Sequence, residues 1–212
     1  NSYKITPSQL KQALTKKTAM LVLNSPNNPG GFTYTPEELK ALAQVLEGTD
    51  VCVLSDEIYE KLIFDGKPSC SIAQVSEELK GKVFVVNGVS KTYAMTGWRI
   101  GYVAGAREVI AGMTKIQSQS TSNPNSIAQK AAIAALTGPQ DSVRNMVRAF
   151  DERRKYLVGR LNGMAGIHCN MPAGAFYAFP NVSHCFQTDP DGRDVRGSGH
   201  LCDYLLTAAR VA

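Results

Sequence analysis

Apolar and polar positions in the first hundred residues predict short strands separated by helices. The expected strands are the apolar runs 19–23, 51–54, 83–86 and 100–104. Threonine–proline pairs open two helical patterns, at Thr6-Pro7 and Thr35-Pro36, where threonine can cap the helix and proline can take its first position. This alternation is typical of an α/β fold in which helices flank a sheet.

The second half of the chain predicts mainly helices, over 106–117, 126–136 and 140–161. The last of these is long and amphipathic, and we expect its apolar stripe to be core rather than a partner-binding surface. The stripe consists of Val143, Met146, Val147, Phe150, Tyr156, Leu157 and Leu161. Residues 189–199 are rich in Asp, Gly and Arg and predict an exposed loop before a final helix.

The most informative segment is 83–103, which predicts a strand, a turn that presents Lys91, and a return through Arg99 into a second strand. A lysine amine can form a Schiff base with an aldehyde, and a guanidinium can bind phosphate oxygens. The pair therefore indicates pyridoxal phosphate. The alternative is that Lys91 is an ordinary solvent-exposed lysine in a turn, with no role in binding. A nucleotide-binding phosphate loop is excluded, because Ser90 stands where its motif needs a glycine before the lysine.

Two other segments end in residues suited to the same cofactor. After the first strand, Asn28 lies in a loop rich in Asn, Pro and Gly and could hydrogen-bond the cofactor's phenolic oxygen, while Pro29 is a candidate for a cis bond. After the second strand, Asp56 could pair with the pyridine nitrogen, and Tyr59 could reach the ring oxygen if a helical turn begins there. The alternative interpretation of the Asn28 loop is an ordinary surface turn, and the alternative role of Asp56 is a helix cap.

Together these residues resemble the fold-type I, pyridoxal-phosphate-dependent aminotransferases of classes I and II, most closely bacterial aspartate or prephenate aminotransferases. The matching motifs are Asn28-Pro29-Gly30-Gly31, Asp56-Glu57-Ile58-Tyr59, Ser90-Lys91 and Gly97-Trp98-Arg99-Ile100-Gly101. A later stretch, 172–177, resembles the strand that opens the family's small domain. The resemblance implies a large domain with a mixed, mostly parallel sheet flanked by helices, followed by the start of a small α+β domain.

The resemblance also implies roles and boundaries. Lys91 would hold the cofactor as an internal aldimine and move the substrate proton. Asp56 would stabilise the pyridinium, Tyr59 and Asn28 would bind the ring oxygen, and Arg99 would bind the phosphate with help from Ser90. The expected parts are 1–138 in the large domain, 139–162 as an interdomain helix and 163–212 in the small domain. We expect an internal fragment of a homodimeric parent that acts on an amino acid and a 2-oxo acid.

The chain departs from the family's pattern in ways that bear on its substrate. Gly88 occupies a position where many relatives have a phosphate-binding serine, so that contact must come from elsewhere. Ser118 stands where some relatives place an arginine for a distal carboxylate. No motif around Arg210 identifies it as the group that binds the substrate α-carboxylate. Aspartate, aromatic amino acids and prephenate therefore all stay open as substrates.

Composition narrows the other function classes. The net charge of +5 is scattered rather than gathered on a basic face, which argues against nucleic-acid binding, and no apolar run has the length of a membrane span. The five cysteines and three histidines form no metal-ligand spacing. We expect free, mostly buried thiols and a cytoplasmic location, with organellar targeting left open because the native N-terminus is expected to be missing.

Two further functions use the same cofactor contacts. One is a pyridoxal-phosphate lyase or synthase of the same fold, which only substrate-side residues would distinguish. The other is an aminotransferase-like effector domain of a transcription regulator, which an upstream winged-helix segment would reveal.

Overall fold

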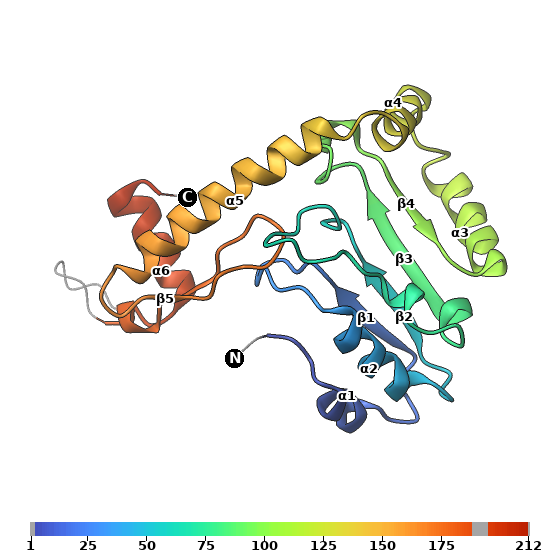
Figure 1. Cartoon of the computed structure of the whole chain (residues 1–212), viewed down its shortest axis with the longest axis horizontal. Helices are drawn as coiled ribbons and strands as arrows, with labels where there is room; N and C mark the ends of the chain where they lie inside the picture. The colour runs from blue at the N-terminus through green and yellow to red at the C-terminus, as the bar shows by residue number, and fades with distance from the viewer. Residues whose placement is uncertain (1–2, 188–194, 212) are drawn as a thin grey trace.

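A four-stranded sheet organises the first half of the chain in the computed structural model, which describes residues 3–187 and 195–211 (Figure 1). Its strands run in the order β1-β2-β3-β4. Their bounds are Met20–Asn24, Cys52–Asp56, Val83–Gly88 and Gly101–Ala104. The first three strands are parallel and β4 is antiparallel to β3. The predicted strands and the mixed, mostly parallel sheet are therefore confirmed, with ends displaced by no more than a few residues.

Helices α1 and α2 lie together beside β1 and β2 (Figure 1). Helix α1 spans Pro7–Ala13 and α2 spans Pro36–Leu46. Each begins at a threonine N-cap with proline in the first turn and a capping box, as the threonine–proline pairs predict.

The apolar side of α2 packs on the sheet and forms a cluster that we call the α2 core. Its buried residues are Leu10, Leu23, Tyr34, Leu39, Leu42, Ala43, Leu46, Val51, Val53, Ile72, Leu79 and Val83. Short 3₁₀ turns at Ile72–Gln74 and Lys80–Lys82 connect β2 to β3 along this cluster.

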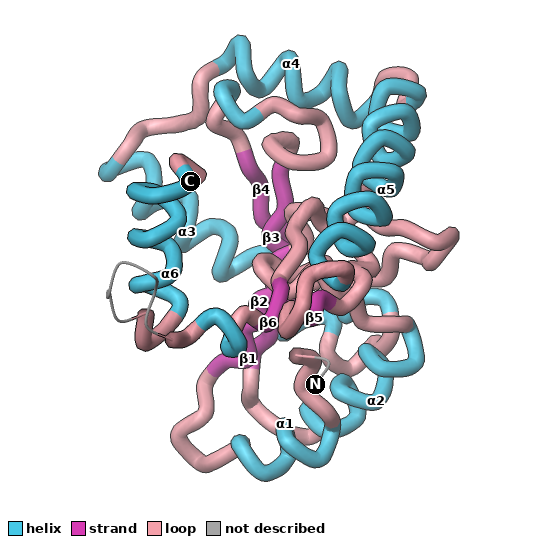
Figure 2. The backbone as a smooth tube through the Cα atoms, turned by 90° about the vertical axis from the view of Figure 1, so that its left-hand side faces the viewer, coloured by secondary structure: helices cyan, strands magenta, loops and turns pink. Residues whose placement is uncertain are grey.

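Three helices follow β4, and all three match their predicted ranges closely. Their bounds are α3 at Arg107–Ser120, α4 at Ser126–Thr137 and α5 at Asp141–Asn162. Helix α5 leads away from the sheet to the last part of the chain, as two views at right angles show (Figures 1 and 2). None of the described helices is long and apolar enough to span a membrane.

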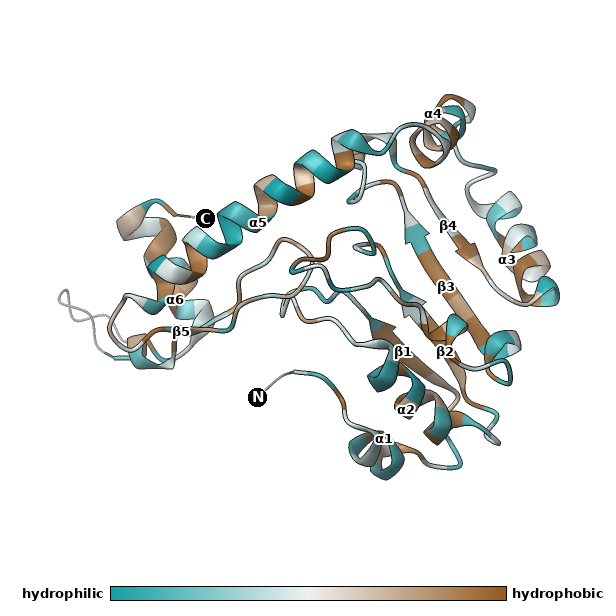
Figure 3. Cartoon of the chain, in the orientation of Figure 1, coloured by the Kyte–Doolittle hydropathy of each residue, from teal (hydrophilic) through white to brown (hydrophobic). Residues whose placement is uncertain are grey.

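The stripe on α5 is only partly core. Val143 is buried and Leu161 is half-buried, but Tyr156 is 72% exposed and Leu157 is 46% exposed. Figure 3 shows the alternation of apolar and polar positions along this helix. The prediction that the whole stripe is core is therefore wrong for Tyr156 and Leu157.

The part beyond α5 is small and irregular. A two-stranded antiparallel ladder joins β5 (His168–Cys169) to β6 (Pro180–Asn181). It is followed by a 3₁₀ turn at Ser183–Cys185, by α6 at Ser198–Tyr204 and by a π-helical turn at Leu205–Ala209. The predicted loop 189–199 falls largely outside the described residues, and its last two residues already belong to α6.

The strand predicted at 172–177 is wrong. Only Gly174 forms an isolated bridge there, to Ile63. Ala173 donates its backbone N–H to Gly31, whereas Ala175 donates to Leu62, so successive backbone groups bond to two different loops instead of one partner strand.

A second buried cluster forms where this segment meets α5 and the turn after β2, and we call it the tyrosine junction. It comprises Tyr59, Leu62 and Ala175, with Ile58, Met146, Val147, Phe150 and Tyr177 packed against them. All five cysteines are free, and only Cys169 is buried, so the expectation of mostly buried thiols is also wrong.

Candidate active site

The carboxyl ends of three parallel strands meet at one edge of the sheet. Asn24, at the end of β1, is the register partner of Asp56, at the end of β2, and Asp56 in turn pairs with Val86 on β3. Gly88, at the end of β3, pairs with Gly101, the first residue of β4. The loop between β3 and β4 therefore begins and ends at this edge. Ligands bind at such an edge in open α/β sheets.

Asn28 is held in the loop after β1 by its asparagine neighbours. Its backbone N–H donates to Asn24 Oδ1 at 2.9 Å, and Gly30 N–H donates to Asn27 Oδ1 at 2.8 Å. The Asn28–Pro29 peptide bond is cis, as the sequence suggests. The Asn28 side chain is exposed and lies near the Tyr59 hydroxyl, whose pKa it lowers. The loop thus presents an amide at the edge of the sheet while its own backbone is satisfied locally.

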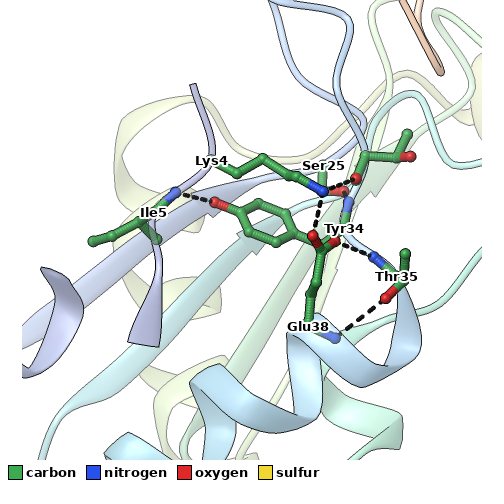
Figure 4. Close-up of polar contacts among 7 residues, drawn as sticks. Lys4, Ile5, Ser25, Tyr34, Thr35 and Glu38 are labelled. Carbon is green, nitrogen blue, oxygen red and sulfur yellow. Dashed lines mark hydrogen bonds and ion pairs between the residues drawn. The ribbon is translucent and has the colours of Figure 1, made fainter. Parts of the chain in front are cut away.

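A network from the N-terminal segment supports the same loop (Figure 4). The backbone N–H of Ile5 donates to the Tyr34 hydroxyl at 2.8 Å, and the Tyr34 N–H donates to Ser25 Oγ at 3.2 Å. Lys4 forms an ion pair with Glu38, and its amine lies 5.6 Å from the centre of the Tyr34 ring. Segment 3–5 is therefore anchored to the loop that carries Asn28, although no sequence pattern predicted this contact.

Asp56 and Tyr59 flank a tight turn rather than the start of a helix. The Leu62 N–H donates to the Tyr59 carbonyl at 2.8 Å, and Asp56 Oδ1 accepts from Ile58 N–H at 3.2 Å. Asp56 is half-buried and has no basic partner among the described residues. Its carboxylate is therefore free to pair with a cationic group of a ligand.

Glu57 is directed away from this edge into the protein. It is 8% exposed and accepts hydrogen bonds from Ser55 Oγ at 2.9 Å and Ser71 Oγ at 2.5 Å. Burial raises the pKa of its carboxyl, while the two serine hydrogen bonds lower it. Two adjacent acids thus have different environments, and only Asp56 is placed to meet a ligand.

Lys91 lies just beyond β3 in the turn that leads to β4. Its side chain is half-buried, and its amine lies 5.9 Å from the centre of the Phe176 ring. It forms no ion pair with the described residues. Ser90 precedes it and is also half-buried, and no hydrogen bond of its side chain links it to the other candidates within 3–187 and 195–211.

Arg99 ends the 3₁₀ turn Thr96–Trp98 immediately before β4. It is exposed, has a left-handed backbone with φ of 51°, and donates from Nη1 to the Thr96 carbonyl at 2.9 Å. No carboxylate pairs with it in the described part of the chain. Its remaining donors can therefore bind an anion at the edge that also holds Lys91.

Gly88 is a glycine for a packing reason. A Cβ built there would lie 3.0 Å from the Ile100 carbonyl oxygen and 3.1 Å from both Gly101 Cα and Ile58 Cδ1. A side chain at residue 88 would therefore press on the backbone at the start of β4, and glycine avoids this contact.

The segment 172–177 brings two aromatic residues that the sequence analysis did not assign to the site. The Phe176 ring lies 5.4 Å from the Tyr59 ring, and the Tyr177 hydroxyl is 2.5 Å from the Tyr59 hydroxyl. The segment docks on Gly31, whose carbonyl accepts from both Ala173 and Gly174. Gly31 has φ of +66°, and a Cβ there would lie 2.4 Å from Pro172 Cβ. In the sequence, the adjacent aromatic residues Phe176 and Tyr177 shortly after Gly174 were the only feature that could have indicated this contact.

Tyr59 connects these segments. It is 3% exposed, and burial is the main reason that its pKa lies far above the ordinary value of 10.0. The hydrogen bond with Tyr177 and the charges nearby, including Asp56, raise it further, whereas the hydrogen bond with Asn28 lowers it. Tyr59 therefore stays neutral and brings Asn28, Asp56 and Tyr177 into one electrostatic group.

Comparison with known proteins identifies the family. Residues 1–210 match the family described as aminotransferase class I and II. The chain belongs to the class I and II aminotransferases. It is 53% identical over 182 residues to an aspartate aminotransferase of Geobacillus stearothermophilus, an alignment that covers 86% of this chain and 46% of that protein.

Other similar proteins agree. An aspartate/prephenate aminotransferase of Nitrosomonas europaea is 46% identical over 213 residues, which cover 99% of this chain and 54% of that protein. The crystal structure of an aspartate aminotransferase from Rhizobium meliloti has a TM-score of 0.94 at 41% identity and covers 99% of this chain and 53% of that one. The chain thus spans about half the length of the curated relatives it matches.

The aminotransferase edge has the chemistry that pyridoxal phosphate needs. The cofactor carries a basic ring nitrogen, a phenolic oxygen, an aldehyde and a phosphate. Asp56 is an acid without a basic partner, and Lys91 and Arg99 are bases without acidic partners, among the residues the structure describes. Asn28 and Tyr59 add an amide and a hydroxyl that already meet. The residues present therefore fit this group.

Two other features of this aminotransferase chain concern substrate and metal. Ser118 is exposed on α3, where its hydroxyl donates to the Lys115 carbonyl at 2.8 Å. Within 3–187 and 195–211, no three His, Cys, Asp or Glu side chains gather to hold a metal ion.

Proposed function

We propose that this chain is part of a pyridoxal-phosphate-dependent aminotransferase that transfers an amino group between an amino acid and a 2-oxo acid. The observation that carries the proposal is that Asp56, Lys91 and Arg99 lie at the edge of the sheet where Asn28 and Tyr59 also meet, and that none of the three forms an ion pair with another described residue. When bound, the cofactor supplies an aldehyde for covalent attachment of an amine and a ring that accepts electrons.

Each of the candidate site residues has a separate task in this proposal. The Lys91 amine holds the cofactor aldehyde and, once released, moves the proton that leaves the substrate α-carbon. The Asp56 carboxylate keeps a proton on the ring nitrogen, because a negative charge beside that nitrogen favours its cationic form. Asn28 and Tyr59 bind the phenolic oxygen. Arg99 binds the phosphate through its planar donors, with Ser90 beside it.

The substrate class in this proposal is aspartate-like, aromatic or prephenate-type. Relatives named aspartate and aspartate/prephenate aminotransferases support an acidic substrate. Ser118 carries no charge, so a distal carboxylate has to be recognised by another group. The proposal extends to a homodimer of the whole protein in a reducing cytoplasmic compartment, which the free thiols favour.

The relatives reported above all carry aminotransferase names, which favours amino transfer over a lyase and over a transcription-regulator domain. None of the described contacts gives either alternative a specific advantage.

Borohydride trapping tests the proposal. The chain is mixed with pyridoxal phosphate, reduced and digested, and the labelled peptide is mapped for wild type, Lys91→Ala and Lys115→Ala. Lys115 is a matched control because it lies exposed on α3. We expect one label on Lys91 in wild type and Lys115→Ala, and none in Lys91→Ala. Spectral change on adding an amino acid, with release of its 2-oxo acid, then identifies a transaminase. Equal labelling of Lys91→Ala would overturn the assignment.

A further inference from the structure

The hydroxyl groups of Tyr59 and Tyr177 form a side-chain contact between distant parts of the sequence at the site. They are 2.5 Å apart although 118 positions separate the two residues in sequence. The rings lie 5.7 Å apart at 83°, an edge-to-face arrangement. The two hydroxyls therefore face each other where the turn after β2 meets the segment that follows β5.

The Tyr59 hydroxyl has two partners with opposite roles. An amide N–H of Asn28 that donates to the Tyr59 oxygen favours its ionised form, which agrees with the lowering effect of Asn28 on the pKa. Tyr177 has the opposite effect on that pKa, and either of the two hydroxyls can be the donor in their hydrogen bond. The Tyr59 hydroxyl therefore has Asn28 and Tyr177 as its two polar neighbours.

Packing does not require the Tyr177 hydroxyl. The backbone of the segment is already fixed by hydrogen bonds from Ala173 and Gly174 to Gly31 and from Ala175 to Leu62. The neighbouring Phe176 ring stacks on Phe150, with centroids 5.4 Å apart. A phenylalanine at position 177 would keep the ring contacts, so the hydroxyl is the feature that needs a separate explanation.

We infer that Tyr177 is a positioning residue whose hydroxyl holds the hydroxyl of Tyr59 beside Asn28 at the cofactor edge. The inference rests on the proposed function in one respect, that Tyr59 and Asn28 serve the phenolic oxygen of the cofactor. Tyr177 itself touches neither substrate nor cofactor in this role. Its hydroxyl adds one side-chain hydrogen bond to the backbone hydrogen bonds that already join the part of the chain after α5 to this edge.

The first test needs no cofactor. The chain is labelled with ¹³C at the ζ carbon of its eight tyrosines, and the Tyr59 signal is assigned by its loss in Tyr59→Phe. That carbon bears the hydroxyl and responds to its hydrogen bonds. We expect Tyr177→Phe to shift the Tyr59 signal, and Tyr156→Phe, at a position 72% exposed, to leave it unchanged. An unmoved Tyr59 signal in a folded Tyr177→Phe chain would overturn the inference.

The second test uses pyridoxal phosphate. We expect Tyr177→Phe to weaken binding by about 2- to 10-fold, the effect of one hydrogen bond, and to change the pH dependence of the bound-cofactor absorbance. Tyr59→Phe removes the hydrogen-bond partner of the Tyr177 hydroxyl. The double variant should therefore bind the cofactor no more weakly than Tyr59→Phe alone. Strictly additive losses would contradict the inference. If the wild-type chain binds no cofactor, the proposed function fails for this chain, and the carbon signal alone decides the role of Tyr177.

Discussion

The α2 core and the tyrosine junction are both buried, but they are held together by different forces. Leu39, Leu42 and Leu46 in the α2 core are each at most 1% exposed and contact other apolar side chains. The tyrosine junction instead places hydroxyl groups and aromatic edges in contact, and the buried charge of Arg154 lies on α5 beside it. Burial of apolar area stabilises the first, whereas the second depends on particular polar partners.

This difference separates stability from chemistry. The α2 core contains side chains of α2 and of strands β1, β2 and β3, and it holds the helix against the sheet. The tyrosine junction joins segments from three parts of the chain around Tyr59. Changes in the first should therefore act on the free energy of unfolding alone, and changes in the second should also alter hydrogen bonding at the site.

The largest expected effect is the loss of a leucine from the α2 core. Leu42→Ala should lower the free energy of unfolding by about 2–5 kcal/mol, because it removes buried methyl groups and leaves a cavity. Urea denaturation measures it. Ile116→Ala on α3 is the control, since Ile116 is 74% exposed, and it should change stability by less than about 0.5 kcal/mol. Equal losses of stability in the two variants would show that burial in the α2 core does not determine the loss.

A smaller loss is expected beside the tyrosine junction on replacing Arg154. It is 7% exposed, donates from Nε to Asp151 at 2.6 Å, and also bonds Asp65 and the Pro172 carbonyl. Arg154→Met keeps the apolar stem and removes the charge. It should cost about 1–3 kcal/mol, because the carboxylates left behind are partly exposed and can be hydrated.

A second arginine on the same helix is the matched control for that prediction. Arg144 forms an ion pair with Asp141 at 2.6 Å, with the same three-residue spacing as Arg154 and Asp151. The Arg144 side chain, however, is 64% exposed. Arg144→Met should change the free energy of unfolding by less than about 1 kcal/mol. A comparable loss in both variants would mean that burial does not distinguish the two ion pairs.

The contrast also explains what the sequence could predict. Leu39, Leu42, Ala43 and Leu46 recur at helical spacing, so α2 and its packing face follow from local pattern. Asp56 and Lys91 were found because each lies at or within a few residues of the carboxyl end of an apolar strand, and strand ends meet at one edge. Arg154 and Asp65 are 89 positions apart, and Tyr59 and Tyr177 are further apart still. No periodicity connects such pairs, so they became visible only in the folded chain.

A pH-dependent effect is expected at Glu57, where the α2 core meets the site edge. Burial raises the pKa of this carboxyl above the ordinary value of 4.5, so the folded state binds its proton more tightly than the unfolded state. The stabilisation from the protonated form is present at low pH and is lost as the pH rises from about 4.5 through the folded-state pKa. The stability of Glu57→Gln relative to wild type should therefore rise with pH in that window.

Urea denaturation at a series of pH values measures this difference. Glu37→Gln is the control, because hydrogen bonds from its own backbone and from Thr35 lower the pKa of the exposed Glu37 carboxyl. Its variant should lose stability relative to wild type as the pH rises, the opposite sign. A flat difference for Glu57→Gln would show that the buried carboxyl does not resist ionisation.

The smallest expected effect concerns Thr92, which follows Lys91 and is 1% exposed. Its Oγ1 has no hydrogen-bond partner among the described residues. Thr92→Val replaces a desolvated hydroxyl by a methyl group of similar size, so stability should stay equal or rise by less than about 1 kcal/mol. Thr92→Ser keeps the hydroxyl and loses the methyl, and it should be less stable than wild type by about 1 kcal/mol. If the order is reversed, with valine the less stable variant, the hydroxyl has a bonded partner and position 92 belongs with the polar contacts of the site rather than with the apolar core.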